Sequence, residues 1–240
     1  MLDARLELNV YELLLQREES VGPWIGEQMQ LTEGAKPEPS IELERLQSRP
    51  HRRRFARTDR SAEFLELRCN DFEELNSEGT IVHAAPLEYV VPSKLSHTTI
   101  ACVLLRQHQG TTYIALDDDD LPAAQSFTGN SELLVTPAWR LPRKIASLTP
   151  ALQWIRDRIA ADYGAQCGKS WALGGRYHPS LGLTPEVVHT FAFEVIEQTP
   201  ISEKLHWVKL QDLIAQRHQL QDGHLRISSI RAAHALGILD

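Results

Sequence analysis

The sequence predicts an α/β fold in which helices pack against a sheet. Three observations support this class. Short β-rich segments follow one another between residues 64 and 136, a helix with clear start and stop signals follows at residues 150–163, and further strands and helices alternate from there onward. Helices and strands mixed along one chain bury their apolar faces by stacking helices on a sheet. We therefore expect an α/β sandwich.

The β-rich part of the chain has two sections. Alternating apolar and polar residues predict a hairpin in a β lead-in at residues 61–95. The main domain, residues 96–240, then begins with a continuous apolar strand, a Gln109-Gly110 turn and an antiparallel partner strand. The expected strands of both sections are residues 64–68, 80–91, 98–105, 111–116 and 133–136.

The clearest helix is predicted at residues 150–163. Thr149 is a suitable N-cap, Pro150 suits the first helical position, and Gly164 suits the left-handed conformation that ends a helix. An apolar stripe predicts that this helix packs on the sheet, and it consists of Leu152, Ile155, Ile159 and Tyr163. The later elements are expected as strands at 171–177, 187–196 and 207–208 and helices at 210–218 and 227–236.

Residues 1–60 are predicted to form an N-terminal helical arm with a basic linker. Apolar residues recur at helical spacing up to residue 28, and a polar, proline-punctuated stretch follows with one short helix candidate at 41–46. The stretch ends in a basic run between Arg49 and Arg60. This run has the chemistry to hold a phosphate, RNA or an acidic partner surface, although a solvated linker is the simpler interpretation. Any protein partner is expected to bind through this arm.

Composition excludes several classes of function. The 240 residues are 42% hydrophobic and 24% charged, and 25 basic against 32 acidic residues give a net charge of −7. The protein as a whole therefore repels phosphate backbones, and nucleic acid is not expected as a partner. The longest uninterrupted apolar stretch, residues 100–105, is far shorter than the ~20 residues of a membrane helix.

The N-terminus and the cysteines indicate a cellular compartment. The first residues lack the basic and apolar regions of a secretory signal. The three cysteines form no CxxC pair, which argues against a disulfide framework or a structural zinc site. We expect a cytoplasmic protein with no membrane contact.

Two segments resemble a known family. Residues 175–191 read Gly-Arg-Tyr-His-Pro-Ser-Leu-Gly-Leu-Thr-Pro-Glu before a strand, and they resemble the segment that follows the Nudix helix in ADP-ribose pyrophosphatase-like Nudix proteins. Residues 205–214 are similar to that family's closing strand and helix. The resemblance covers about residues 96–240 and implies a Nudix-like α/β/α sandwich with a mixed sheet. It also implies a homodimer formed through the N-terminal β segment.

The family's sequence box is degenerate in this chain. With the last glycine of the box placed on Gly164, residues 141–143 match its Leu-Pro-Gly start with Arg143 in place of glycine. Family members hold Mg²⁺ or Mn²⁺ with carboxylates on one helix face, and here that face carries Arg158, Ala161 and Asp162. Asp162 is thus the one candidate metal ligand of the box, although an ordinary ion pair with Arg158 is the simpler interpretation. No cofactor is expected, and Mg²⁺ or Mn²⁺ would be needed only by an active hydrolase.

One acid in the second segment is a candidate for catalysis. The resemblance implies that Glu186 is a general base for water, whereas a capped loop entering a strand is the simpler interpretation. Tyr177 has a ring that can stack on a base or ribose. The full set of candidate ligand-binding residues is Arg143, Arg158, Tyr177, His178, Ser180 and His189.

Three functions remain open from the sequence. The leading hypothesis is a pseudoenzyme, because the carboxylates of the box are missing. It would be a Nudix-like domain that binds a nucleoside-diphosphate-linked ligand such as ADP-ribose or NAD, or that acts as an interaction or regulatory module. The second hypothesis is an active metal-dependent hydrolase of nucleoside diphosphate derivatives that uses Glu186, Asp162 and the acidic run Asp117 to Asp120. The third is a scaffold subunit that docks on a larger complex through residues 1–60.

Overall fold

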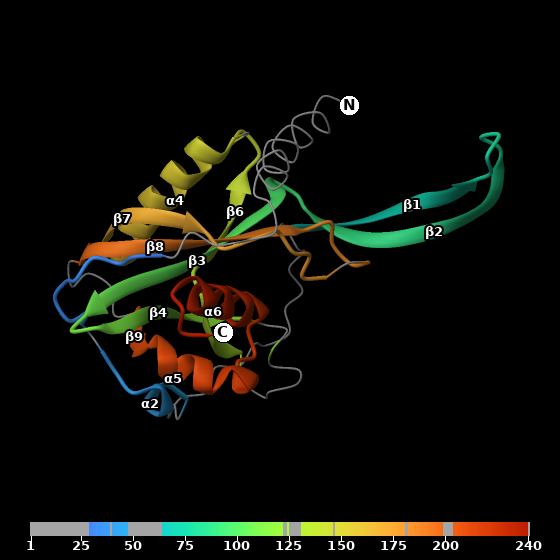
Figure 1. Ribbon diagram of the computed structural model, residues 1–240. Coiled ribbons are helices and arrows are strands. Elements are labelled where there is room, and N and C mark those ends of the chain that lie inside the picture. The colour runs from blue at the N-terminus through green and yellow to red at the C-terminus, as the bar shows by residue number, and fades with distance from the viewer. Residues whose placement is uncertain are drawn as a thin grey trace.

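The computed structural model describes residues 29–38, 40–47, 64–121, 124, 131–145, 147–180, 182–198 and 204–239. Figure 1 shows how their elements are arranged. In chain order these elements are α2 (Leu43–Gln47), β1 (Leu65–Leu75), β2 (Ile81–Pro92), β3 (Leu95–His108), β4 (Thr111–Asp120), β5 (Glu132–Val135), β6 (Ala138–Pro142), α4 (Leu148–Tyr163), β7 (Ala165–Ala172), β8 (Val187–Gln198), β9 (His206–Lys209), α5 (Leu210–Ala215), η2 (Arg217–Gln219) and α6 (Gly223–Ala235).

The main sheet is mixed, as predicted. Its strand order is β5-β4-β3-β8-β7, with β6 paired to β3 and β9 paired to β4. The central pair β3–β8 is parallel, and the other pairings among the described strands are antiparallel. Helix α4 covers one face of this sheet, and α5 and α6 cover the other (Figure 1). The predicted α/β/α sandwich is therefore confirmed.

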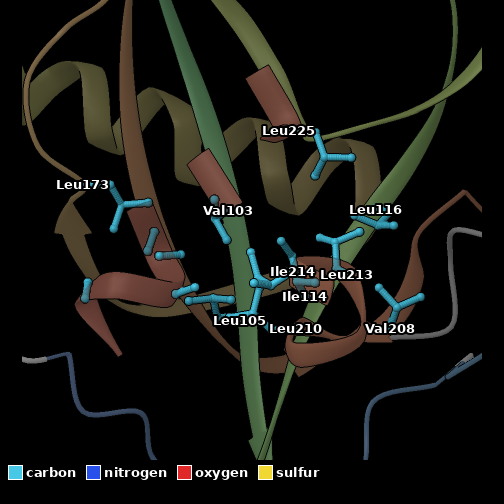
Figure 2. Close-up of a cluster of buried hydrophobic side chains, with 14 of the residues drawn as sticks. Val103, Leu105, Ile114, Leu116, Leu173, Val208, Leu210, Leu213, Ile214 and Leu225 are labelled. Atoms are coloured by element: carbon cyan, nitrogen blue, oxygen red, sulfur yellow. The ribbon is translucent and has the colours of Figure 1, made fainter. Parts of the chain in front are cut away.

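The two faces of β3 bury two separate apolar cores. Side chains alternate along a strand, so Ile100, Cys102 and Leu104 pack with α4, while Val103 and Leu105 pack with α5 and α6. Figure 2 shows the second of these cores, in which Leu213 and Leu225 from the two helices approach the strands. This alternation decides on which face each candidate site residue lies.

Helix α4 ends where the sequence predicts and begins earlier. Gly164 adopts the left-handed conformation (φ 63°, ψ 20°), and its N–H donates to Ala160 O. The N-cap is Ser147 and not Thr149, and the Ser147 carbonyl accepts the N–H of Ala151. The earlier start is explained by Leu148, which packs against the core on this face of the sheet and so adds a turn to the helix.

Residues 32–38 and 40–47 differ from the linker that their composition predicts. Met29, Leu43 and Leu46 are buried in the core beneath α5 and α6, and Ile41 N–H donates to Trp207 O at 2.9 Å. Prolines disfavour regular helices and strands in this segment. Its backbone hydrogen-bonds to the sheet instead, so the segment is still part of the domain. The predicted N-terminal helix and the basic run lie outside the described residues.

The predicted hairpin is present as β1–β2. It extends from the body of the protein as a two-stranded arm (Figure 1). Both strands are exposed along most of their length. Large apolar side chains at or beside it are between 45% and 66% exposed, namely Phe64, Leu65, Leu67, Phe72, Leu75, Ile81, Val82 and Leu87.

Two further strand predictions need correction, and one strand was missed. The acidic run expected to follow a strand lies inside β4, because β5 pairs with Asp117 to Asp120 and satisfies their backbone. Strand β6 was not predicted. Strand β7 spans Ala165–Ala172 and not 171–177, because it pairs with β8 directly after the helix ends.

Helix α6 also begins earlier than predicted, since the Asp222 side chain accepts the N–H groups of His224 and Leu225 and so caps it. No described helix combines the length and apolar character that crossing a membrane requires.

Candidate functional site

Glu186 lies at the end of the loop that precedes β8, where it joins three strands. The hydroxyl of Thr99 donates to its Oε1, and Nη2 of Arg140 donates to its Oε2 at 2.8 Å. Thr99 and Arg140 are opposite each other in the β3–β6 pair, and Thr99 also pairs with Val188 of β8. The sheet therefore positions this group, and the Arg140 and Glu186 side chains are only 18% and 12% exposed.

This arrangement makes Glu186 an anchor between the loop and β6. A general base needs to reach a water molecule beside the substrate. Here the Thr99 hydroxyl and the Arg140 guanidinium each donate a hydrogen bond to one of the two carboxylate oxygens of Glu186, which is largely buried. The guanidinium of Arg140 also lies 5.9 Å from the centroid of the Phe64 ring, which covers it at the base of the hairpin.

Asp162 pairs with a different arginine, Arg158, which also lies on helix α4. Nη2 of Arg158 donates to its Oδ2 at 2.6 Å, and the indole N–H of Trp139 donates to the same oxygen at 3.2 Å. The Trp139 ring is tilted against Tyr163, with ring centroids 5.9 Å apart. The helix ion pair expected between residues 158 and 162 is therefore present, and it is tied to β6 through Trp139.

Glu186 and Asp162 lie on opposite faces of the sheet. Trp139 and Arg140 are neighbours on β6, so their side chains point to opposite sides. Trp139 packs with the α4 core, whereas Thr99 alternates with Ile100 and shares the face of α5 and α6. The two acids that the sequence combined into one site do not converge.

The residues of the box do not fit a divalent cation. Mg²⁺ and Mn²⁺ prefer several oxygen ligands, but Asp162 already accepts two hydrogen bonds, Ala161 offers no ligand and Arg158 is positive. Among the residues that the structure describes, no group of three or more His, Cys, Asp or Glu side chains is placed to hold a metal.

The acidic run of β4 is divided between the two faces as well. The Tyr163 hydroxyl donates to Asp117 Oδ2 at 2.6 Å, whereas Asp118 Oδ2 lies 2.9 Å from His206 Nε2. Burial raises the pKa of Asp117, and the hydrogen bond from Tyr163 acts in the opposite direction. These acids therefore bind their own neighbours and do not form a second carboxylate cluster with Asp162.

Tyr177 belongs to a cluster that includes helix α6. Its hydroxyl lies 2.5 Å from His224 Nδ1, and Arg231 lies 5.7 Å from the centroid of its ring. Burial raises the pKa of Tyr177, so the phenol stays protonated. Arg231 also donates to the carbonyl of Gly175 and to the hydroxyl of Thr190. Sequence reasoning missed His224 and Arg231, because only the tertiary fold brings α6 beside this loop.

The other candidate ligand-binding residues are dispersed. His178 lies beside Glu186, where its Nδ1 donates to the Glu186 carbonyl at 3.1 Å. The Ser180 carbonyl accepts two backbone N–H groups within the turn that follows it. Arg143 donates to the carbonyls of Pro92, Ser93 and Leu95 and so clamps the β2–β3 link.

His189 is buried on the face of α4. It borders a void of about 10 Å³ with Ile100, Leu141 and Phe191, which is too small for an organic ligand. Tyr177 and His178 are thus joined to α6 and to Glu186, respectively, while Arg143, Arg158 and His189 lie elsewhere.

The fold is an α/β/α sandwich, as predicted, with a mixed sheet, a parallel β3–β8 pair and two helical layers. No protein-family model and no curated protein matches the chain. Among solved structures, it is similar to a Nudix hydrolase from Nitrosomonas europaea with a TM-score of 0.41 and 18% identity, covering 60% of this chain and 95% of that one. It is also similar to an ADP compounds hydrolase with a TM-score of 0.49 and 8% identity, covering 87% of this chain and 97% of that one.

Proposed function

We propose that this protein is a catalytically degenerate Nudix-like domain that binds a nucleoside-diphosphate-linked ligand, of the ADP-ribose or NAD type, without hydrolysing it. The observation that carries the proposal is the pairing of both candidate acids with arginines on opposite faces of the sheet. A working hydrolase would need a general base and metal ligands around one substrate. In this chain the corresponding groups are separated and neutralised.

The arginines supply the chemistry for binding. A guanidinium presents a planar set of donors that matches phosphate oxygens in two parallel hydrogen bonds. Arg158 occupies the helix face on which the resembling family holds a cation, and its side chain is 42% exposed. A diphosphate group bound there would replace the Asp162 carboxylate as the partner of Arg158. Because the diphosphate carries more negative charge than a carboxylate, no metal is required for this binding.

The experiment measures binding and hydrolysis separately. Calorimetric titration with ADP-ribose and NAD in EDTA is expected to show binding that Arg158→Gln weakens at least tenfold. Arg226→Gln is the matched control, because Arg226 is an exposed arginine on α6, a helix on the opposite face of the sheet. AMP release from ADP-ribose is expected to be absent with Mg²⁺ or Mn²⁺.

Two outcomes would overturn this proposal. Absence of binding to either ligand would remove the nucleotide part and leave an interaction or scaffold module. Metal-dependent AMP release that Glu186→Gln abolishes would instead establish an active hydrolase with a non-standard site. Asp162→Ala in the same assay would show whether the α4 acid takes part.

The hairpin favours self-association as a second property. An isolated two-stranded hairpin is marginally stable in water, and exposed apolar patches mark interaction surfaces. A second copy would bring the same apolar side chains to β1 and β2 and would cover them symmetrically. We propose a cytoplasmic homodimer formed through this arm, and the three unpaired cysteines suit a reducing compartment.

Sedimentation of the full chain tests the dimer. The parent protein is expected to sediment as a dimer, and Leu67→Lys combined with Phe72→Lys to give a monomer. Glu73→Lys lies on the same strand and is the control for added charge. A monomeric parent protein, or a dimer that both variants retain, would contradict the proposal.

A further inference from the structure

A cleft among the described residues lies far from the candidate site. It has a volume of about 440 Å³, which is within the range of small-molecule sites. It lies at the β3–β4 turn on the face of α5 and α6, and Gln107 lies eight residues along β3 from Thr99, or ~26 Å at the rise of a strand. Its lining residues are Met29, Gln30, Leu31, Gln107, Gly110, Thr112, Gln211, Leu236 and Ile238.

Backbone hydrogen bonds hold the walls of this cleft in place. Met29 N–H donates to Ala235 O at 2.9 Å, and Gly34 N–H donates to Gln107 O at 3.0 Å, so residues 29–34 are tied at both ends. The turn is held as well, because the Glu33 carboxylate accepts the N–H groups of Gln109 and Gly110 at 2.9 and 3.0 Å. A ligand would therefore meet a preformed site.

The lining combines an apolar surface with uncharged polar groups. Gln107 and Thr112 are directly opposite each other on β3 and β4, so their side chains are neighbours on one face. Gln211 lines the same cleft from α5. Within the described part of the chain, the carboxamides of Gln107 and Gln211 and the hydroxyl of Thr112 have no hydrogen-bond partner. The polar groups of the cleft are thus available to a ligand.

We propose that this cleft binds an uncharged planar nitrogen heterocycle, namely a nucleobase as the free base or nucleoside. A glutamine carboxamide both donates and accepts, which matches the paired donor and acceptor on the edge of a base such as adenine. The apolar side chains of Met29, Leu31 and Ile238 offer contact to the flat face of the ring. None of the described lining residues is charged, so a phosphate group would lose its hydration without a cation from them to replace it.

This site is independent of the function proposed above, because it uses different residues at the other end of β3. Binding there is read from the Gln side-chain NH₂ signals in nitrogen–proton correlation spectra of the full chain. Titration with adenosine is expected to give saturable shifts of the Gln107 and Gln211 signals, with AMP binding more weakly. The indole signal of Trp139, which reports on the Arg158 region, is expected to stay unchanged.

Variants of the lining test the contacts. Gln107→Leu and Gln211→Leu are each expected to weaken adenosine binding at least tenfold. Thr112→Val keeps the side-chain shape and is expected to weaken it severalfold, which guards against a variant that only disturbs folding. Gln219→Leu is the matched control, because Gln219 is exposed and lies outside the cleft.

Three results would overturn the proposal. One is the absence of saturable shifts with adenosine, guanosine and uridine. Another is equal adenosine affinity in Gln107→Leu, Gln211→Leu and the parent protein. The third is tighter binding of AMP than of adenosine, which would show that the cleft selects a charged ligand. Loss of ADP-ribose binding at Arg158 would leave this proposal unaffected.

Discussion

The Arg140–Glu186 ion pair should contribute to stability well beyond an ordinary surface pair. In Arg140→Met, the Glu186 carboxylate keeps only the Thr99 hydroxyl while its side chain is 12% exposed. Removing one partner of a buried ion pair costs ~3–5 kcal/mol, and partial exposure lowers the expected loss here to ~2–3 kcal/mol. Glu186→Gln keeps one acceptor oxygen for Arg140 and introduces an amide donor that the Thr99 hydroxyl can accept, so its expected cost is smaller, ~1 kcal/mol.

A double-mutant cycle isolates the pair. Urea unfolding of the parent, both single variants and the double variant gives the coupling free energy, provided the denaturant slopes agree. The expected coupling is ~1–2 kcal/mol. The matched control is the Arg68–Glu66 pair, which has the same chemistry with side chains 44% and 53% exposed, so its coupling should be close to zero. Equal coupling in the two cycles would refute the anchoring role of Glu186.

Three further predictions concern Asp117, Gly168 and the three cysteines. Burial raises the pKa of Asp117 above its usual 3.8, so its contribution to stability is complete below about pH 4 and declines as the pH rises through the folded value. Asp117→Asn should therefore gain stability relative to the parent as pH rises, and a constant difference between urea midpoints would contradict this. Gly168→Ala would place a Cβ 2.9 Å from Ile196 Cγ2 and 3.0 Å from Glu194 Oε2, so unfolding should become easier by ~1–3 kcal/mol. An unchanged melting temperature would show that the strands adjust freely. Cys69 is exposed, whereas burial raises the pKa of Cys167 to about 11 and also raises the pKa of Cys102. A thiol reagent at about pH 8 should therefore modify one thiol in the native protein and three in urea. Fast modification of a second native thiol would disprove it.

Local signals predicted those elements whose cause is local. Gly164 ends α4 because a residue without Cβ adopts the left-handed conformation at little cost, and the sequence shows that glycine. The alternation in the lead-in predicted the β1–β2 hairpin because it reflects side chains on two faces of a strand. In contrast, β6 has five residues and no distinctive pattern, and its pairing with β3 alone makes it a strand.

The candidate site depended on pairings that no local pattern contains. Arg140 and Glu186 are 46 residues apart, and Tyr177 and His224 are 47 residues apart. Their contacts follow from strand order and from the position of α6. Sequence spacing correctly predicted the i, i+4 pair of Arg158 and Asp162, because that geometry belongs to the helix itself.

The sequence by itself determined the fold class, the main strands, the end of helix α4 and the presence of Arg158, Ala161 and Asp162 on one face of that helix. These follow from side-chain periodicity, backbone preference and residue identity, which act over a few positions. Only the tertiary structure decided that Glu186 and Asp162 lie on opposite faces, that residues 29–47 are part of the core, and that three strands meet at the Arg140–Glu186 pair. The reason is physical: the face of a strand is set by its register with neighbours, and that register arises from packing between segments far apart in the chain.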